Sequence, residues 1–496
     1  MMHFGGWSAA AGLGVALVVA GTGAYAEGVG DVVRWIKDPY NVERKTSPSH
    51  DKRWESSAPL PSVTVEADSE ALPADKALTL PELTEFALRN NARTRQAWFA
   101  ARAAAASLGV TLGDGLPQVQ GAYQVQRARP ISSTNPTNNV IWLNRWGPQI
   151  SFNYVIYDFG GLDARVDAAE YRLLAANLAQ NRVLQEVIFQ VEQAYYQLIG
   201  IEALVRVNEQ SLKNVETALD AARRRRESGL ATVADVYRTE TQVAQAQLTL
   251  TRSRGEFEKA RGQLSTVVGL PIRSSVRVQT LTAPPQTTQA VSAINDYLER
   301  AKLIRPDLVA AESQVRATRA SALAASKAGL PSIEINGQYA VSNWAKSGFL
   351  HDPDRPATHA YSTTLNIRIP IFSGFKDTYT VRQAEIAAQQ AEAARDAVFR
   401  QTQLEVWQSY YDLQTVSGSI KSTEALVKSA EQTAQATLAR YQSGFGTILD
   451  LITAQQDESN ARTQRIQSYL DWYTVLARLH LAVGANDLMA TKSESK

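Results

Sequence analysis

The feature that most constrains this chain is an internal duplication with a constant spacing. The segment Tyr195-Tyr196-x-Leu198 recurs as Tyr410-Tyr411-x-Leu413, an offset of 410 − 195 = 215 residues. Other pairs share this offset: Ser228-Gly229 with Ser443-Gly444, Thr232 with Thr447, Asp235 with Asp450, and Val268-Gly269 with Val483-Gly484. Upstream, Gly115-Leu116-Pro117 matches Gly329-Leu330-Pro331 with an offset of 329 − 115 = 214. We therefore divide the chain into a first repeat at 79–271, a linker at 272–292 and a second repeat at 293–484.

The distribution of proline predicts very long helices within each repeat. All 18 prolines lie outside 149–270 and 371–496, and proline inside a helix costs about 3 kcal/mol. Apolar residues in these stretches follow coiled-coil spacing, as in Leu212, Val215, Leu219 and Ala222. The helix before each break runs for about 65 residues, which corresponds to about 100 Å.

Each helical stretch contains one break, at 228–232 and at 443–447. Gly229 and Gly444 are suited to the position just after a helix, where a left-handed backbone is common. Thr232 with Asp235, and Thr447 with Asp450, have the spacing of a capping box that starts the next helix. The sequence thus predicts two tight helical hairpins with tips at 228–232 and 443–447.

Four segments of about ten residues alternate between apolar and polar side chains, at about 117–129, 147–157, 331–342 and 361–372. This length suits tilted transmembrane strands, and no apolar run after residue 26 has the roughly 20 residues of a transmembrane helix. A soluble sandwich with one buried face is the alternative. Four strands cannot close a barrel, since transmembrane barrels begin at about eight strands. Several chains must then combine, giving twelve strands from three chains or sixteen from four.

The N-terminal 26 residues have the pattern of an export signal, with an apolar run that ends in Ala24-Tyr25-Ala26. We expect the mature chain to begin at Glu27, although a segment without Lys or Arg also fits an uncleaved anchor. The polar segment 27–78 is predicted to be an extended periplasmic arm, and 485–496 a polar tail.

Composition offers little support for an enzyme or a nucleic-acid-binding protein. The net charge is +2, cysteine is absent, and the five histidines do not pair at a zinc-binding spacing. We therefore predict no catalytic residues, no metal ligands and no nucleic-acid partner.

The duplicated pattern resembles the TolC family of outer-membrane efflux and secretion channels. The matching residues include the Leu116-Pro117 and Leu330-Pro331 strand entries, the junction Pro370-Ile371-Phe372-Ser373-Gly374, and the second tip from Tyr441 to Asp450. The resemblance covers about residues 79–484 and implies a mainly helical protomer. Three copies would form a 12-stranded outer-membrane barrel that continues into a periplasmic helical barrel. It also implies a periplasmic adaptor, an inner-membrane transporter of ABC or RND type, contact with outer-membrane lipid, and no cofactor.

The resemblance also assigns functional positions. The adaptor-contacting tips correspond to Gly229, Leu230, Gly444 and Phe445. The family's periplasmic gate corresponds to Asp450, Thr453 and Tyr441.

This chain departs from the pattern at two gate positions, because Thr453 is not acidic and Gly446 stands where the best-known member of the family has an arginine. Arg238, or the run Arg223–Arg226, is a candidate replacement for that arginine. Asp450 itself fits both a carboxylate ring at a constriction and a simple helix cap.

Two functional hypotheses follow. The first is the exit duct of a tripartite efflux pump or a type I secretion system. The second is a periplasmic coiled-coil scaffold or adaptor with a soluble β domain. The sequence does not identify the substrate. We expect the inner-membrane transporter to determine which substrate is exported.

Overall fold

The computed structural model describes residues 77–128, 143–272, 274, 276–279, 293–345 and 357–485. Chain contacts separate Met1–Glu66 from Ala67–Lys496, and every described residue belongs to the second unit. The predicted export signal, the arm up to residue 76 and the tail from 486 lie outside the described residues. Among the described helices, none is both long enough and apolar enough to cross a membrane.

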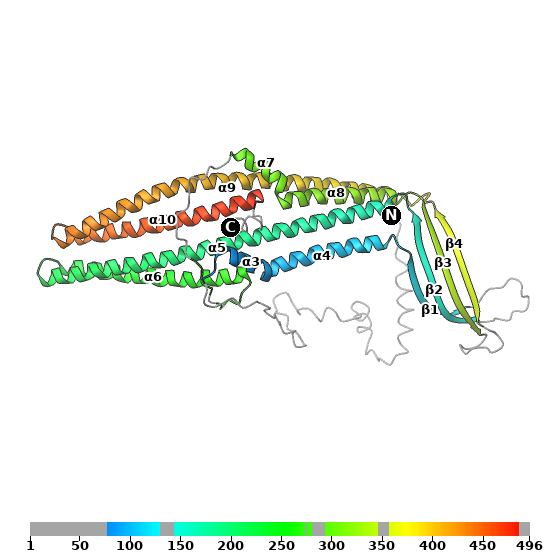
Figure 1. The fold of residues 1–496 in the computed structure, drawn as a ribbon, viewed down its shortest axis with the longest axis horizontal. Helices are drawn as coiled ribbons and strands as arrows, with labels where there is room; N and C mark the ends of the chain where they lie inside the picture. Colours follow the sequence, from blue (N-terminus) through cyan, green and yellow to red (C-terminus); the bar gives the residue numbers. More distant parts are fainter. Residues whose placement is uncertain are drawn as a thin grey trace, which may run out of the picture. The chain divides into compact units, whose positions relative to one another are not determined.

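Two helical hairpins of equal size dominate the described unit (Figure 1). In the first repeat, α5 (Gly161–Glu227) turns into α6 (Val233–Val268), and in the second, α9 (Lys376–Gln442) turns into α10 (Ile448–Val483). Helices α5 and α9 each contain 67 residues, about 100 Å of helix. Shorter helices complete each repeat: α3 (Leu80–Asn90) and α4 (Ala92–Gly113) in the first, α7 (Ile294–Ile304) and α8 (Pro306–Lys327) in the second. The duplication therefore appears as two similar sets of helices.

The helices pack as two connected rows. Towards the sheet, α4 packs on α5, α5 on α8, and α8 on α9. Towards the tips, α6 packs on α5, α5 on α10, and α10 on α9. Apolar side chains fill these contacts, with Val187, Leu198 and Leu264 fully buried in one cluster and Val406 and Leu479 in another.

The break between the short helices of each repeat is tied to the end of the second hairpin helix. In the first repeat, the Asn91 side-chain amide donates a hydrogen bond to the Val267 carbonyl at 2.8 Å. In the second, the Arg305 guanidinium donates to the Ala482 carbonyl at 3.0 Å. The two acceptors differ by 482 − 267 = 215 positions, so they are equivalent. The same connection is made by an amide in one repeat and by a buried cation in the other.

The strands form one antiparallel sheet in the order β1 (Gln118–Ala128), β2 (Leu143–Tyr157), β3 (Ser332–Ala345) and β4 (Thr358–Arg368). The register gathers the predicted apolar residues on one face, where Ile150 lies opposite Tyr339, and Tyr339 opposite Tyr361. On the other face Gln120, Ser151, Gln338 and Ser362 align across all four strands. The Phe152 ring lies over Gly337, where a Cβ atom would approach it to 1.9 Å.

The two largest differences from the predicted strand bounds are of four residues each. Strand β2 begins at Leu143 rather than near 147, and it incorporates Pro148, whose partner on β1 is Tyr123. The pairing of β2 with β3 is interrupted there, where Gly147 closely approaches the Val341 carbonyl. Strand β4 ends at Arg368 rather than at 372, because Pro370 has no N–H to continue the ladder.

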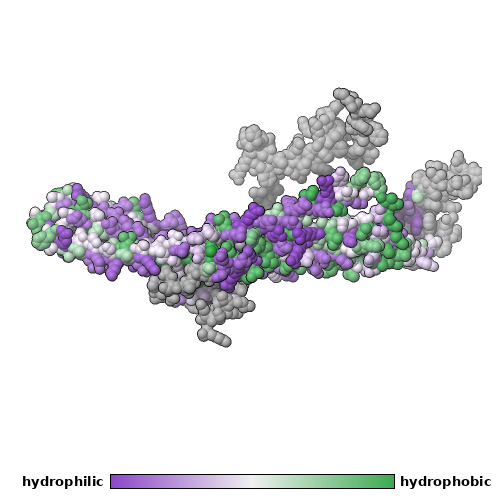
Figure 2. Space-filling view, turned by 90° about the horizontal axis from the view of Figure 1, so that it is seen from above, coloured by the Kyte–Doolittle hydropathy of each residue, from purple (hydrophilic) through white to green (hydrophobic). Residues whose placement is uncertain are grey.

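Both outer strands of the sheet are open within the described unit. Strand β1 pairs with β2 and β4 pairs with β3, and neither has a second described neighbour. The outer strands are also exposed on both faces, with Val119 68%, Leu365 60% and Ile367 63% exposed. Figure 2 shows hydrophobic residues gathered at the end of this unit that carries the sheet. The protomer thus leaves strand edges and apolar surface uncovered.

Candidate functional site at the helical hairpin tips

The first tip is a self-contained turn of five residues between α5 and α6. The Leu230 N–H donates to the Arg225 carbonyl at 2.8 Å, while Gly229 adopts φ +74°. This pattern closes the end of α5, and glycine adopts its left-handed conformation without strain. Thr232 then begins α6, since its Oγ1 accepts from the Asp235 N–H and the Asp235 carboxylate accepts from the Thr232 N–H.

The second tip has the same construction. The Phe445 N–H donates to the Arg440 carbonyl at 2.9 Å, and Gly444 has φ +92°. Thr447 and Asp450 form a capping box in which the Asp450 Oδ2 also lies 2.8 Å from Thr447 Oγ1. Both turns therefore follow from local residues alone.

Each tip presents one large apolar side chain to solvent. Leu230 is 69% exposed and Phe445 is 82% exposed. A Cβ atom on Gly229 or on Gly444 would meet nothing within 4 Å. The four residues predicted as adaptor contacts thus lie on open surface, two as apolar side chains and two as the glycines beside them.

An apolar cluster joins the two hairpins just behind the tips. It contains residues of α5, α6, α9 and α10, with Ala218, Leu219, Ala222, Val236, Tyr441, Ile448 and Leu451 buried. Tyr441 is 3% exposed, and its hydroxyl has no hydrogen-bond partner within the described residues. Burial accordingly raises the pKa of Tyr441.

Arg225 of the first repeat holds Tyr441 of the second. Its guanidinium carbon lies 4.7 Å from the centre of the Tyr441 ring, and its Nη1 donates to the Tyr441 carbonyl. Arg223, in the same basic run, instead pairs with Glu240 of its own hairpin at 2.8 Å. Of the candidate arginines, Arg225 is the one whose contact crosses between the hairpins.

The other predicted gate residues lie on the exposed surface of α10. Asp450 and Thr453 are both exposed, so the structure separates them from the buried Tyr441. The side-chain and backbone hydrogen bonds from Thr447 lower the pKa of Asp450. The equivalent bonds from Thr232 lower the pKa of Asp235. Both carboxylates are therefore charged at neutral pH and act as helix caps within the protomer.

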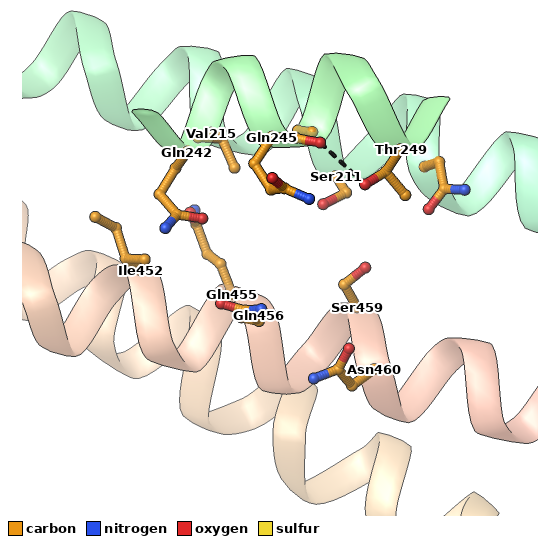
Figure 3. Close-up of a pocket in the computed structure, with 12 residues that line it drawn as sticks. Ser211, Val215, Gln242, Gln245, Thr249, Ile452, Gln455, Gln456, Ser459 and Asn460 are labelled. Carbon is orange, nitrogen blue, oxygen red and sulfur yellow. Dashed lines mark hydrogen bonds between the residues drawn. The ribbon is translucent and has the colours of Figure 1, made fainter. Parts of the chain in front are cut away.

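A polar cavity of about 150 Å³ lies between the hairpins beyond the apolar cluster (Figure 3). Amides and hydroxyls dominate its lining, among them Gln242, Gln245, Gln456, Ser459 and Asn460. The Gln455 Oε1 atom is buried there without a hydrogen-bond partner in the described structure. Our sequence analysis did not identify this cavity. The sequence signal that could have revealed this cavity is a change from apolar residues to amides along the sides of α6 and α10 that face each other.

A buried carboxyl group lies on α5, away from the tip. Glu192 is followed one turn later by Tyr196, whose ring stacks on Tyr473 of α10 with centroids 4.7 Å apart. The Glu192 Oε2 is buried without a hydrogen-bond partner among the described residues, and burial raises the pKa of Glu192 to about 7. The folded protein therefore favours the neutral form of this side chain.

We expect Glu192→Gln to stabilise the protein above neutral pH. A raised pKa in the folded state gives stability that is complete below the unfolded value of 4.5 and lost as pH rises through about 7. Thermal unfolding should show a gain on the order of 1–3 kcal/mol at about pH 8 and almost none at about pH 4. The exposed Glu216→Gln serves as the control. Equal effects at both pH values would contradict the assignment.

Comparison with known proteins decides the class of this chain. The family model described as outer membrane efflux protein matches residues 83–270 and 297–485, one match in each repeat. The chain belongs to the outer membrane efflux protein family. The protein is located in the outer membrane and functions as an export channel. The scaffold or adaptor hypothesis is therefore not favoured.

Individual relatives support this membership. Protein CyaE of Bordetella pertussis is 25% identical over 400 residues, which cover 79% of this chain and 82% of the relative. Outer membrane protein OprJ of Pseudomonas aeruginosa is 25% identical over 380 residues, covering 76% and 78%. A crystal structure of a membrane protein from Pseudomonas aeruginosa aligns with TM-score 0.73 and 24% identity over 88% of this chain and 100% of that one. The mainly helical duplicated fold with its four-stranded sheet is thus the fold of outer membrane efflux proteins.

Proposed function

We propose that three copies of this chain form a continuous duct through the outer membrane and into the periplasm. The observation that carries the proposal is the four-stranded sheet with both outer strands open. In lipid, unpaired backbone groups cost several kcal/mol each, so the edges require strands from other copies. Three copies supply twelve strands, the number that the family resemblance implies.

The duct itself is proposed to be passive, with no catalytic residue and no cofactor. An inner-membrane transporter supplies the energy, and a periplasmic adaptor contacts the tips. The exposed Leu230 and Phe445 support that role, because burying such side chains against a partner contributes about 1.5–3 kcal/mol each. The system is either a tripartite efflux pump or a type I secretion system.

Native mass spectrometry and planar-bilayer conductance test the duct directly. We expect detergent-purified protein to be trimeric and to form ion-conducting pores in a phospholipid bilayer. A stable monomer, or protein that remains in solution without detergent, would contradict the proposal.

We further propose that the tips form the periplasmic gate. Asp450 and Thr453 of each copy would line the constriction, while Tyr441 fixes the hairpins behind it. The exposure of Asp450 and its charged state at neutral pH support this role. Arg225 takes the place of the missing arginine at Gly446, because its contact with Tyr441 joins the two hairpins.

We expect Asp450→Asn to raise single-channel conductance or to weaken blockade by divalent cations. The substitution removes a negative charge but keeps an oxygen that can accept the Thr447 N–H bond. Asp235→Asn is the matched control, because it changes the equivalent capping box in the first repeat. If Asp450→Asn behaves like wild type in both assays, Asp450 is a helix cap alone.

A further inference from the structure

The polar cavity between the hairpins is lined by hydrogen-bonding groups that do not pair across it. Nine of its twelve lining residues carry an amide or a hydroxyl group, and none of these described residues is charged. The Thr249 hydroxyl donates to the Gln245 carbonyl within α6, but no hydrogen bond joins the lining side chains of the two hairpins in the described structure. Elsewhere on α5, the Gln210 amide donates to Asn214 at 2.8 Å. Pairing of amides is therefore possible on these helices, yet the two walls of the cavity lack it.

The side chains of both walls converge on the gap. Gln242 and Gln245 of α6 point into it from one side, and Gln455 and Ser459 of α10 from the other (Figure 3). The Gln455 Oε1 atom is buried and has no donor in the described structure, and an unpaired buried acceptor costs about 1–3 kcal/mol. The cavity of about 150 Å³ has room for about five water molecules or one small organic molecule. It is thus suited to a guest that donates a hydrogen bond.

The lining also determines the chemical class of that guest. A charged molecule would lose its hydration without meeting an opposite charge, because no described lining residue is charged. An apolar molecule would leave the amides of both walls unpaired. Amide and hydroxyl groups, in contrast, can donate to the Gln455 Oε1 atom and can accept from the glutamine and asparagine N–H groups around it. The best guest is therefore a small neutral molecule that carries such groups.

The cavity lies on the same side of α10 as the proposed gate. The lining residue Asn460 follows Thr453 by 460 − 453 = 7 residues, about two helical turns, so the two side chains share a face of the helix. This spacing corresponds to about 10 Å along the helix axis. The first-repeat equivalent of Asn460 is Gln245, since 460 − 215 = 245, and both are exposed lining residues on opposite walls. The two repeats therefore contribute equivalent positions to the two edges of the opening.

We propose that this cavity is a binding site for exported molecules directly inside the gate, and that it takes small neutral molecules with amide or hydroxyl groups. Every copy of the chain adds one such site to the duct. A molecule that has passed the constriction meets these hydrogen-bonding groups before it moves along the conduit. The inference rests on the proposed duct and on the assignment of Asp450 and Thr453 to its constriction.

Cysteine labelling tests the site in a chain that has no native cysteine. N-acetylglycinamide is the test molecule, because it is neutral and carries both amide N–H and carbonyl groups. We expect it to slow the reaction of Ser459→Cys with N-ethylmaleimide, measured by mass spectrometry, by about tenfold at about nine times its Kd. N,N-dimethylacetamide accepts hydrogen bonds but donates none, so it should leave the reaction rate unchanged.

Two further variants separate binding in the cavity from other effects. Thr463 is exposed one turn farther along α10 and is not a lining residue, so the amide should leave the labelling rate of Thr463→Cys unchanged. Gln455→Leu removes the unpaired oxygen, so adding it to Ser459→Cys should abolish protection while circular dichroism shows a normal fold. A Ser459→Cys rate that does not depend on the amide would mean that the cavity holds water alone. That outcome, or protection that survives Gln455→Leu, would overturn the inference.

Single-channel recording tests whether the site opens onto the conduit. We expect a bulky maleimide attached to Asn460→Cys to lower the conductance. Thr217→Cys is the control, because Thr217 is exposed on the side of α5 opposite the lining residues Asn208 and Val215, so the same label there should leave the conductance unchanged. If both labelled proteins conduct like their unlabelled forms, the cavity lies outside the export path, which overturns the inference and leaves the duct intact. Protein that forms no pores would contradict the duct itself.

Discussion

Arg305→Ala is expected to lower the free energy of unfolding by roughly 3–5 kcal/mol, the usual cost of removing one partner from a buried ion pair. The Arg305 side chain is 3% exposed and lies 2.8 Å from Asp307 and 2.6 Å from Glu405. It also donates to the Ala482 carbonyl, so one side chain connects the α7–α8 break to both α9 and α10. Removing it takes the guanidinium away from the Ala482 carbonyl and from both carboxylates, which keep only the Leu308 N–H on Asp307 and the Gln401 amide on Glu405 as hydrogen-bond donors in the described structure.

Thermal unfolding followed by far-ultraviolet circular dichroism measures this effect. Arg319→Ala is the control, since Arg319 is 58% exposed and its pair with Glu392 contributes at most about 1 kcal/mol. Arg305→Lys keeps the charge but cannot reproduce the branched contacts, so it should fall between wild type and alanine. If Arg305→Ala unfolds like Arg319→Ala, the buried network does not stabilise the fold.

Arg225→Ala is expected to loosen the two hairpins at their tips and to raise the open probability of the proposed pore. The substitution removes a guanidinium–ring contact and a hydrogen bond to the Tyr441 carbonyl. Together these contribute about 2 kcal/mol, which corresponds to roughly a thirtyfold change in an equilibrium between closed and open tips.

Single-channel recording in a planar bilayer provides the measurement. Arg223→Ala is the matched control, because Arg223 lies two residues away and its ion pair in the described structure is with Glu240 of its own hairpin. We expect longer openings for Arg225→Ala and wild-type openings for Arg223→Ala. Tyr441→Phe should keep the closed state, since the hydroxyl it removes has no partner in the described structure. Identical open times for the Arg225 and Arg223 variants would reject the assignment of Arg225 to the gate.

The mainly helical duplicated fold could be predicted because its signals are local. Proline-free stretches give the long helices, and alternation gives four strands whose apolar residues align across the sheet. The start of β2 could not be predicted, because Pro148 is tolerated only through an interruption in the pairing with a strand far away in sequence.

The candidate site divides in the same way. The turns at Gly229 and Gly444 depend on their neighbours, whereas the contact of Arg225 with Tyr441 joins residues 216 positions apart. Sequence alone offered Arg238 and four consecutive arginines as equal candidates. Only packing separates them, because the helix rotation at the tip decides which side chain faces the opposite hairpin. The sequence analysis also missed the buried Arg305, because its burial depends on how distant helices pack.

The self-capped tips also have a consequence for how such a channel changes its partners over time. Each turn is stabilised by hydrogen bonds among its own residues. These bonds join Thr232 and Asp235 in the first repeat, and Thr447 and Asp450 in the second. The side chains of Leu230 and Phe445 take no part in these hydrogen bonds, since both residues contribute only backbone groups to the turns. Mutations at these two positions can therefore accumulate without disturbing the fold that displays them. The proposed adaptor contacts at the tips can thus change in sequence independently of the helices that carry them.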